Sequence, residues 1–125
     1  MEELGWTGFV QARLMQRHGL FEGAVLTAVP FAVLHLPRAF TAGWTWSSAA
    51  VTIAAVIVLA PFLRYLLGML YLDTAGSLLA VGIMHAAFNA SGSLGVVRGG
   101  WQYIPALIVL TIAMALWRRR HPPAQ

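Results

Sequence analysis

Residues 77 to 89 read SLLAVGIMHAAFN and place a histidine and an asparagine at the end of an apolar run. On a helix, His85 and Asn89 are four residues apart and lie on one face. The run before them is long enough to enter a lipid bilayer. An imidazole and a carboxamide at that depth cost free energy unless they face a polar partner or a water-filled cavity. The stretch therefore predicts a membrane helix that carries a buried polar site.

The composition of the whole chain is typical of a membrane protein. Of its 125 residues, 59% are hydrophobic and only 10% are charged, whereas a soluble domain carries about a quarter charged residues. We therefore expect an all-α, multi-pass transmembrane helix bundle in the cell membrane, in contact with membrane lipid. It would form a single domain over residues 1–117, followed by a basic, disordered tail over 118–125. The chain has no cysteine, which excludes disulfides and thiolate metal sites.

Apolar runs and their breaks predict five helical segments, at 2–19, 23–40, 47–72, 77–89 and 101–117. The last four are apolar enough to span a bilayer, while the first has polar ends. Gly19 is a plausible stop for the first segment. Residues 73–77, DTAGS, form a polar turn that can cap the fourth segment. Pro61 lies within the third segment, which can cross with a tilt or with a break at this proline.

The charges are arranged as in a membrane protein. The net charge is +4 and all eight basic residues are arginine. In a soluble protein this balance would suggest nucleic acid, but these arginines stand at segment ends and we expect no nucleic-acid partner. If each segment crosses, Arg13, Arg17, Arg64 and the tail arginines share one side, and Arg38 and Arg98 the other, which predicts a cytoplasmic C-terminus. Arg64 is expected to snorkel to the interface.

Five polar residues remain at depth, on three separate segments: Glu2, Glu3, His35, His85 and Asn89. Each alone has a plain structural explanation. A histidine can bond a neighbouring helix, Asn89 can cap a helix, and the two glutamates can be solvated at a helix start. In a chain with so few polar groups, however, the five are most cheaply accommodated by facing one another.

The chemistry of this set favours hydrolysis by an activated water molecule. A buried carboxylate can act as a general base, and an imidazole can share the proton or orient the water. A second imidazole and an amide NH2 can donate to a developing oxyanion. No cysteine exists, and no serine has an obvious base and orienting group beside it, so a protein nucleophile is not expected.

Three motifs in order carry a family resemblance: EELGWTG at 2–8, FAVLH at 31–35 and HAAFN at 85–89. Together they resemble the CPBP intramembrane proteases, the family of type II CAAX prenyl endopeptidases and bacteriocin-processing Abi proteins. The resemblance runs from Glu2 to about Ser91. It implies an intramembrane endopeptidase that acts on a membrane-associated peptide or protein, of CAAX or lipidated type.

The resemblance also implies roles for the five residues. Glu2 would be the base, acting with His35 on water, with Glu3 as its partner in the acidic pair. His85 and Asn89 would hold the oxyanion. The family is often labelled as metalloproteases, and a zinc ion could be held by Glu2, His35 and His85. A neutral asparagine is a poor zinc ligand, so we favour no cofactor.

Two departures from the family pattern leave alternatives open. The first motif is usually Glu-Glu-x-x-x-Arg, and the arginine position holds Thr7, which cannot supply the charge. Family members also have further helices before this motif, so we expect an N-terminally truncated chain. Both points favour a catalytically degenerate member that acts as a bacteriocin-immunity or scaffolding protein. A small transporter or channel subunit would also place polar residues at depth.

Overall fold

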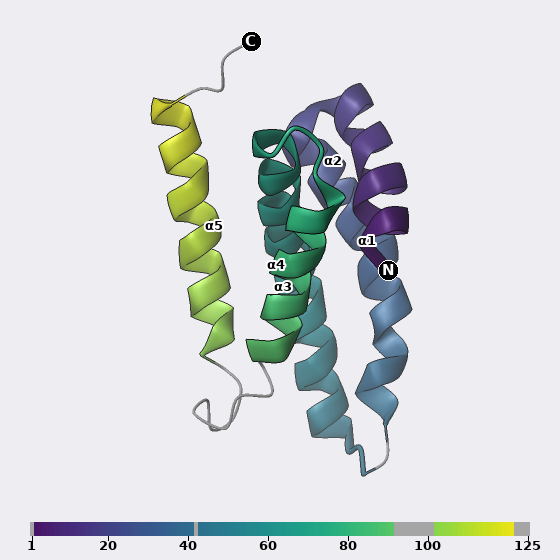
Figure 1. The fold of residues 1–125 in the computed structure, drawn as a ribbon. Helices are drawn as coiled ribbons and strands as arrows, with labels where there is room; N and C mark the ends of the chain where they lie inside the picture. Colours follow the sequence, from purple (N-terminus) through teal and green to yellow (C-terminus); the bar gives the residue numbers. More distant parts are fainter. Residues whose placement is uncertain (1, 42, 92–101, 122–125) are drawn as a thin grey trace.

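The computed structural model describes residues 2–41, 43–91 and 102–121, and every regular element in these ranges is helical. In chain order the elements are α1 (Glu2–Gly5), the π-helix η1 (Trp6–Gln11), α2 (Ala12–His35), the 3₁₀ helix η2 (Leu36–Phe40), α3 (Trp46–Asp73), α4 (Leu78–Ser91) and α5 (Tyr103–Arg120). They form a bundle whose long axes run roughly side by side (Figure 1). The predicted all-α helix bundle is confirmed.

The first two predicted segments form a helical hairpin that turns at Gly19. This residue interrupts α2 with φ 81° and ψ 172°, a backbone conformation that is open to glycine and strained for other residues. The chain rises through α1 and η1 to this turn and descends through the rest of α2 (Figure 1). The two legs approach closely at Gly23, where an added Cβ would lie 2.6 Å from the backbone nitrogen of Met15. A glycine at each position is therefore required by the hairpin.

Helix α3 lies at the centre of the bundle and contacts α2, η2, α4 and α5. It begins at a capping box in which Thr45 and Ser48 bond each other's backbone N–H groups. Such reciprocal bonds satisfy two donors that a helix start leaves free. The helix continues through Pro61 to Asp73 without interruption, as one element, so Pro61 does not break it. Its buried face forms most of the apolar core: Leu59, Ala60, Leu63, Leu66, Leu67 and Met69.

The polar turn predicted at 73–77 joins α3 to α4. Ala75 and Gly76 adopt positive φ, and the Ser77 hydroxyl accepts a hydrogen bond from the Ala80 N–H at the start of α4. This turn sends α4 back along α3 (Figure 1). It thereby brings His85 of α4 into the buried interior, within hydrogen-bond distance of Glu3 of α1.

Helix α5 packs on α3 and extends three residues beyond the predicted boundary. Arg118 donates to the Met69 carbonyl at 3.0 Å and forms an ion pair with Asp73. These contacts hold the last turn of α5 against the end of α3, so Arg118 to Arg120 are helical and not part of a disordered tail. Residues 122–125 of the predicted tail, like the predicted loop after α4, lie outside the described ranges.

The outer surface of the bundle suits a lipid environment. By length and composition, two helical stretches can cross a membrane, Glu2–Phe40 and Trp46–Asp73, and α4 is a shorter apolar helix. The first stretch contains the turn at Gly19 and so provides two antiparallel legs (Figure 1). Large apolar side chains are exposed along these helices, among them Val29, Val33, Leu34, Val51 and Ile57. In hydrocarbon such side chains carry no exposure penalty.

Candidate functional site

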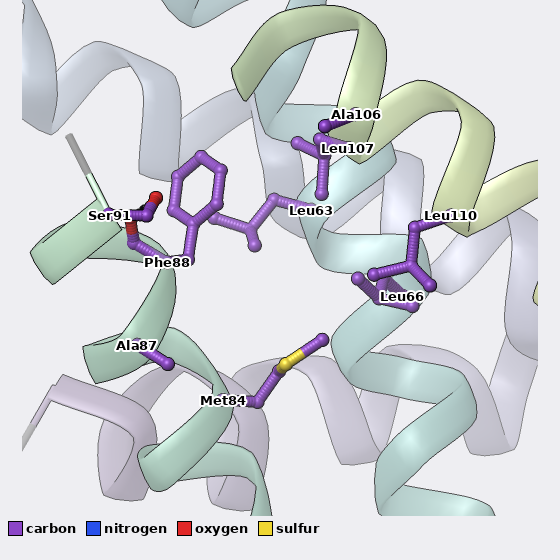
Figure 2. A pocket seen from close by; sticks show the side chains of 9 residues that line it. All are labelled: Leu63, Leu66, Met84, Ala87, Phe88, Ser91, Ala106, Leu107 and Leu110. Atoms are coloured by element: carbon purple, nitrogen blue, oxygen red, sulfur yellow. Dashed lines mark hydrogen bonds between the residues drawn. The ribbon is translucent and has the colours of Figure 1, made fainter. Parts of the chain in front are cut away.

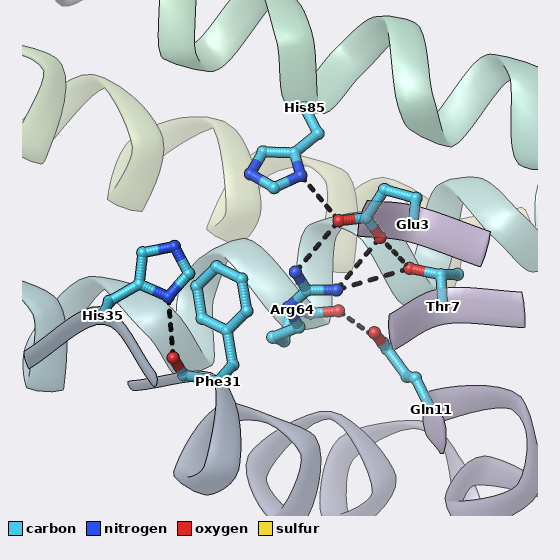
Figure 3. Close-up of polar contacts among 7 residues, drawn as sticks. All are labelled: Glu3, Thr7, Gln11, Phe31, His35, Arg64 and His85. Atoms are coloured by element: carbon cyan, nitrogen blue, oxygen red, sulfur yellow. Dashed lines mark hydrogen bonds and ion pairs between the residues drawn. The ribbon is translucent and has the colours of Figure 1, made fainter. Parts of the chain in front are cut away.

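A cluster of four buried polar residues lies in the apolar interior, each from a different element (Figure 3). Glu3 of α1 is its centre, and its carboxylate binds Thr7, Arg64 and His85. The His85 Nδ1–H donates to Glu3 Oε1 at 2.6 Å. The Thr7 hydroxyl donates to Glu3 Oε2. Glu3 and His85 are each only 6% exposed, so the bond between them forms out of contact with bulk water.

Arg64 provides the positive charge of the cluster, and the prediction that it snorkels to the interface is wrong. Its side chain is fully buried and binds Glu3 with both terminal nitrogens, each at 3.0 Å. The guanidinium carbon also lies 4.1 Å from the centre of the Phe31 ring, within the range of a cation–π contact. α3 continues for more than two turns beyond Arg64. The side chain therefore turns inward to a carboxylate rather than outward to the membrane surface.

The π-helix η1 aligns the polar residues of the first segment. Glu3, Thr7 and Gln11 follow at four-residue spacing, and all three are buried. Gln11 donates through Nε2 to the Arg64 carbonyl oxygen at 2.6 Å. Gly68 leaves the space for this amide, since an added Cβ there would lie 2.6 Å from Gln11 Nε2. A π-helical turn within an α-helix is frequent at functional sites, and here it faces the buried ion pair.

The two histidines of the predicted site both lie near Phe31 (Figure 3). The Phe31 ring centre is 4.1 Å from that of His35 and 6.2 Å from that of His85. His35 donates its Nδ1–H to the Phe31 carbonyl at 2.8 Å, and His85 gives its Nδ1–H to Glu3. Each imidazole is thus oriented through Nδ1, which leaves Nε2 for a substrate or a water molecule.

The structure brings together some of the five predicted site residues and not others. Glu3 and His85 are buried and bonded to each other, and His35 is half-buried beside them across Phe31. Glu2 and Asn89 are exposed, and neither side chain bonds another residue within the described ranges.

Sequence reasoning did not find Thr7 and Arg64 of the cluster, or Gln11, which bonds the Arg64 backbone. The four-residue spacing that continues from Glu3 could have indicated Thr7 and Gln11. For Arg64, the signal was its distance from the end of its helix.

The site supports proton transfer and hydrogen-bond donation rather than metal binding. Among the described residues, no three His, Asp or Glu side chains gather as a metal site. The set considered for zinc, Glu2, His35 and His85, is therefore not gathered as a metal site, and the His85 Nδ1 is bonded to Glu3. These side chains, as arranged, do not fit a zinc ion.

An apolar cavity of about 180 Å³ lies on the other side of α4, between this helix, α3 and α5 (Figure 2). Met84 and Phe88 line it from positions that flank His85 on α4. Ser91 contributes a hydroxyl, and the other lining side chains are apolar: Leu63, Leu66, Ala87, Ala106, Leu107 and Leu110. α4 thus presents a polar face to the cluster and an apolar face to the cavity.

Comparison with known proteins identifies the family. A search of curated proteins and a search of solved structures each found no match. A family model described as type II CAAX prenyl endopeptidase Rce1-like matches residues 1–91. The matched range contains all five predicted site residues and the whole Glu3–Arg64–His85 cluster, while α5 follows it. This family is a protease family whose members are embedded in the membrane. With nearly three quarters of its length matched, the chain belongs to the type II CAAX prenyl endopeptidase Rce1-like family.

Proposed function

We propose that this protein is an intramembrane endopeptidase that hydrolyses peptide bonds of membrane-associated substrates with a glutamate-activated water. The observation that carries the proposal is the buried 2.6 Å hydrogen bond between Glu3 and His85. It joins residues 82 positions apart in the chain and orients an imidazole with Nε2 directed away from the carboxylate. A buried carboxylate that orients a histidine in this way is a common device of hydrolytic sites.

Glu2 and His35 are the residues that we assign to the water. Both oxygens of Glu3 are taken by Arg64, Thr7 and His85, whereas the Glu2 carboxylate bonds no other side chain within the described residues. Glu2 would take a proton as the water oxygen attacks the peptide carbonyl carbon. The same proton would pass to the amide nitrogen as the C–N bond breaks. His35 Nε2 would orient the water.

His85 and Asn89 are the residues that we assign to the carbonyl oxygen. The bond from Nδ1–H to Glu3 orients the His85 ring so that a proton on Nε2 can be donated to the oxyanion. The amide NH2 of Asn89, one turn further along α4, would add a second donor. Preorganised donors of this kind stabilise the charge that develops in the transition state.

The substrate that we propose is an apolar or lipid-modified peptide, including the CAAX type. The apolar cavity beside Met84 and Phe88 supports this choice, because both residues flank His85 on α4. An apolar substrate group in the cavity would be held against the helix that carries the oxyanion donor. A polar group there would meet almost no hydrogen-bonding partner.

Proteolysis in liposomes tests the proposal. The chain is incubated with a library of membrane-anchored and lipidated peptides, and cleavage is measured by mass spectrometry. We expect cleavage by the parent and a loss of about 100-fold in rate for His85→Ala, the size expected for one transition-state donor. The matched control is His18→Ala, an exposed histidine on the first leg of the hairpin, which should cleave like the parent. Equal cleavage by the parent and His85→Ala would refute the assignment.

The second candidate function is a non-catalytic one, in bacteriocin immunity or membrane scaffolding. It is favoured by the exposure of Glu2 and Asn89, neither of which joins the buried cluster. It predicts that a folded parent chain cleaves no peptide of the library. The same assay therefore separates the two functions.

We further propose that the C-terminus faces the cytoplasm. The end of the bundle with the Gly19 turn and the last turn of α5 carries Arg13, Arg17 and Arg118 to Arg120, while η2 places Arg38 at the other end (Figure 1). Because Arg64 is buried, it is not counted among the arginines that indicate the orientation in the membrane. The chain has no cysteine, so His121→Cys is a unique thiol. In intact cells it should resist an impermeant maleimide, and labelling from outside would reverse the orientation.

A further inference from the structure

We infer that Arg64 is a positioning residue of the catalytic site, which acts on His85 through Glu3. The inference rests on the proposed function. In this scheme Arg64 of α3 holds the Glu3 carboxylate in place, and that carboxylate in turn orients the His85 imidazole. Arg64 touches neither the water nor the substrate peptide in this scheme.

The geometry of the ion pair carries the inference. Arg64 Nη1 binds Glu3 Oε2 and Nη2 binds Glu3 Oε1, both at 3.0 Å. Oε1 is the same oxygen that accepts the His85 Nδ1–H. A two-point contact from a planar guanidinium fixes both the position and the rotation of a carboxylate. Any rotation of the Glu3 carboxylate would move the hydrogen bond that orients His85.

The surroundings leave the Arg64 side chain little freedom. Its side chain is fully buried, with the Phe31 ring at 4.1 Å and the Trp6 ring at 5.7 Å. Phe31 also contacts His35. The guanidinium therefore lies between the carboxylate and the aromatic ring that separates the two histidines.

Position 7 could supply the same charge from another helix. The Thr7 hydroxyl bonds Glu3 Oε2 and lies 3.4 Å from Arg64 Nη1. An arginine at position 7 is one turn from Glu3 on the same face, so its guanidinium can reach the same oxygens once the Arg64 side chain is removed. The inference therefore predicts that the positive charge can be moved from α3 to η1 with recovery of function.

The test compares kcat and KM of four proteins: the parent, Arg64→Ala, Arg64→Lys, and the double variant Thr7→Arg with Arg64→Ala. We expect Arg64→Ala to lower kcat on the order of 100-fold with little change in KM, since a misplaced catalytic group costs about this much. Arg64→Lys keeps the charge without the two-point contact and should fall between. The double variant should regain most of the lost kcat. Arg118→Ala, which removes the arginine paired with Asp73 at the end of the bundle, is the matched control and should keep the parent's kcat.

A second measurement, made on folded variants, keeps the test independent of activity. The ¹⁵N NMR signals of His85 report which ring nitrogen carries the proton. We expect Nδ1 to be protonated in the parent and in the double variant, and a mixture of forms in Arg64→Lys. If the parent cleaves nothing, the proposed function fails while these signals still decide the role of Arg64. Unchanged His85 signals in folded Arg64→Lys, or a folded double variant no more active than Arg64→Ala, would overturn the inference.

Discussion

Glu2→Gln is expected to lower kcat/KM by a factor of about 10² to 10⁴, the contribution of a positioned general base. The amide has the shape of the carboxylate and cannot accept the proton of the attacking water. Glu2 is exposed and bonds no other described residue, so the substitution should leave the free energy of unfolding nearly unchanged. The measurement is the initial rate of peptide cleavage in liposomes, together with the melting temperature of the same samples.

Glu3, the acid next to Glu2, allows a loss of activity to be distinguished from a loss of stability. Glu3→Gln should lower both the cleavage rate and the melting temperature, because it leaves Arg64 buried opposite a neutral amide. Glu22→Gln, an exposed acid on the first hairpin, should change neither quantity. Cleavage by Glu2→Gln at the parent's rate would show that Glu2 is not the base and would move that role to another group.

Arg64→Met is expected to lower the free energy of unfolding by about 3–5 kcal/mol, the usual cost of leaving one partner of a buried ion pair without its counter-charge. The remaining partner would be Glu3, only 6% exposed. Methionine is similar in length to the arginine stem, so little of the loss would come from an empty cavity. Reversible unfolding in mixed micelles of lipid and a denaturing detergent measures the change.

The double variant Glu3→Gln with Arg64→Met provides the internal comparison. Since it removes both charges, most of the lost stability should return, although the catalytic arrangement does not. The control is the pair Arg118–Asp73, which is partly accessible to solvent; its removal should cost about 1 kcal/mol or less. If the two single substitutions at Glu3 and Arg64 add in the double variant, the two side chains are not coupled and the ion pair does not stabilise the fold.

The helical segments could be predicted because their signals are local. Glycine at position 19 adopts a positive φ that other residues avoid, and the serine of the polar turn at 73–77 caps the next helix. Both features act within a few residues along the chain. The end of α5 was predicted too early because the contacts of Arg118 with Asp73 and Met69 come from a helix far away in sequence.

Composition predicts that some of the polar residues meet in the interior, but not that the pair is Glu3 and His85. In a chain with few polar groups, the two are more stable facing each other than facing hydrocarbon. The cation that binds Glu3, Arg64, was missed. The distance of Arg64 from the end of its segment could have indicated an inward side chain, but no neighbouring position identifies Glu3 as its partner.

The sequence by itself determined that this protein is a membrane helix bundle of the type II CAAX prenyl endopeptidase Rce1-like family, because hydrophobic runs, turn residues and motifs are properties of neighbouring positions. Only the tertiary structure decided which polar residues meet. It set Arg64 against Glu3, left Glu2 and Asn89 exposed, and placed Phe31 beside both histidines. The rotation of each helix about its axis settles such pairings, and that rotation depends on packing among all the helices at once.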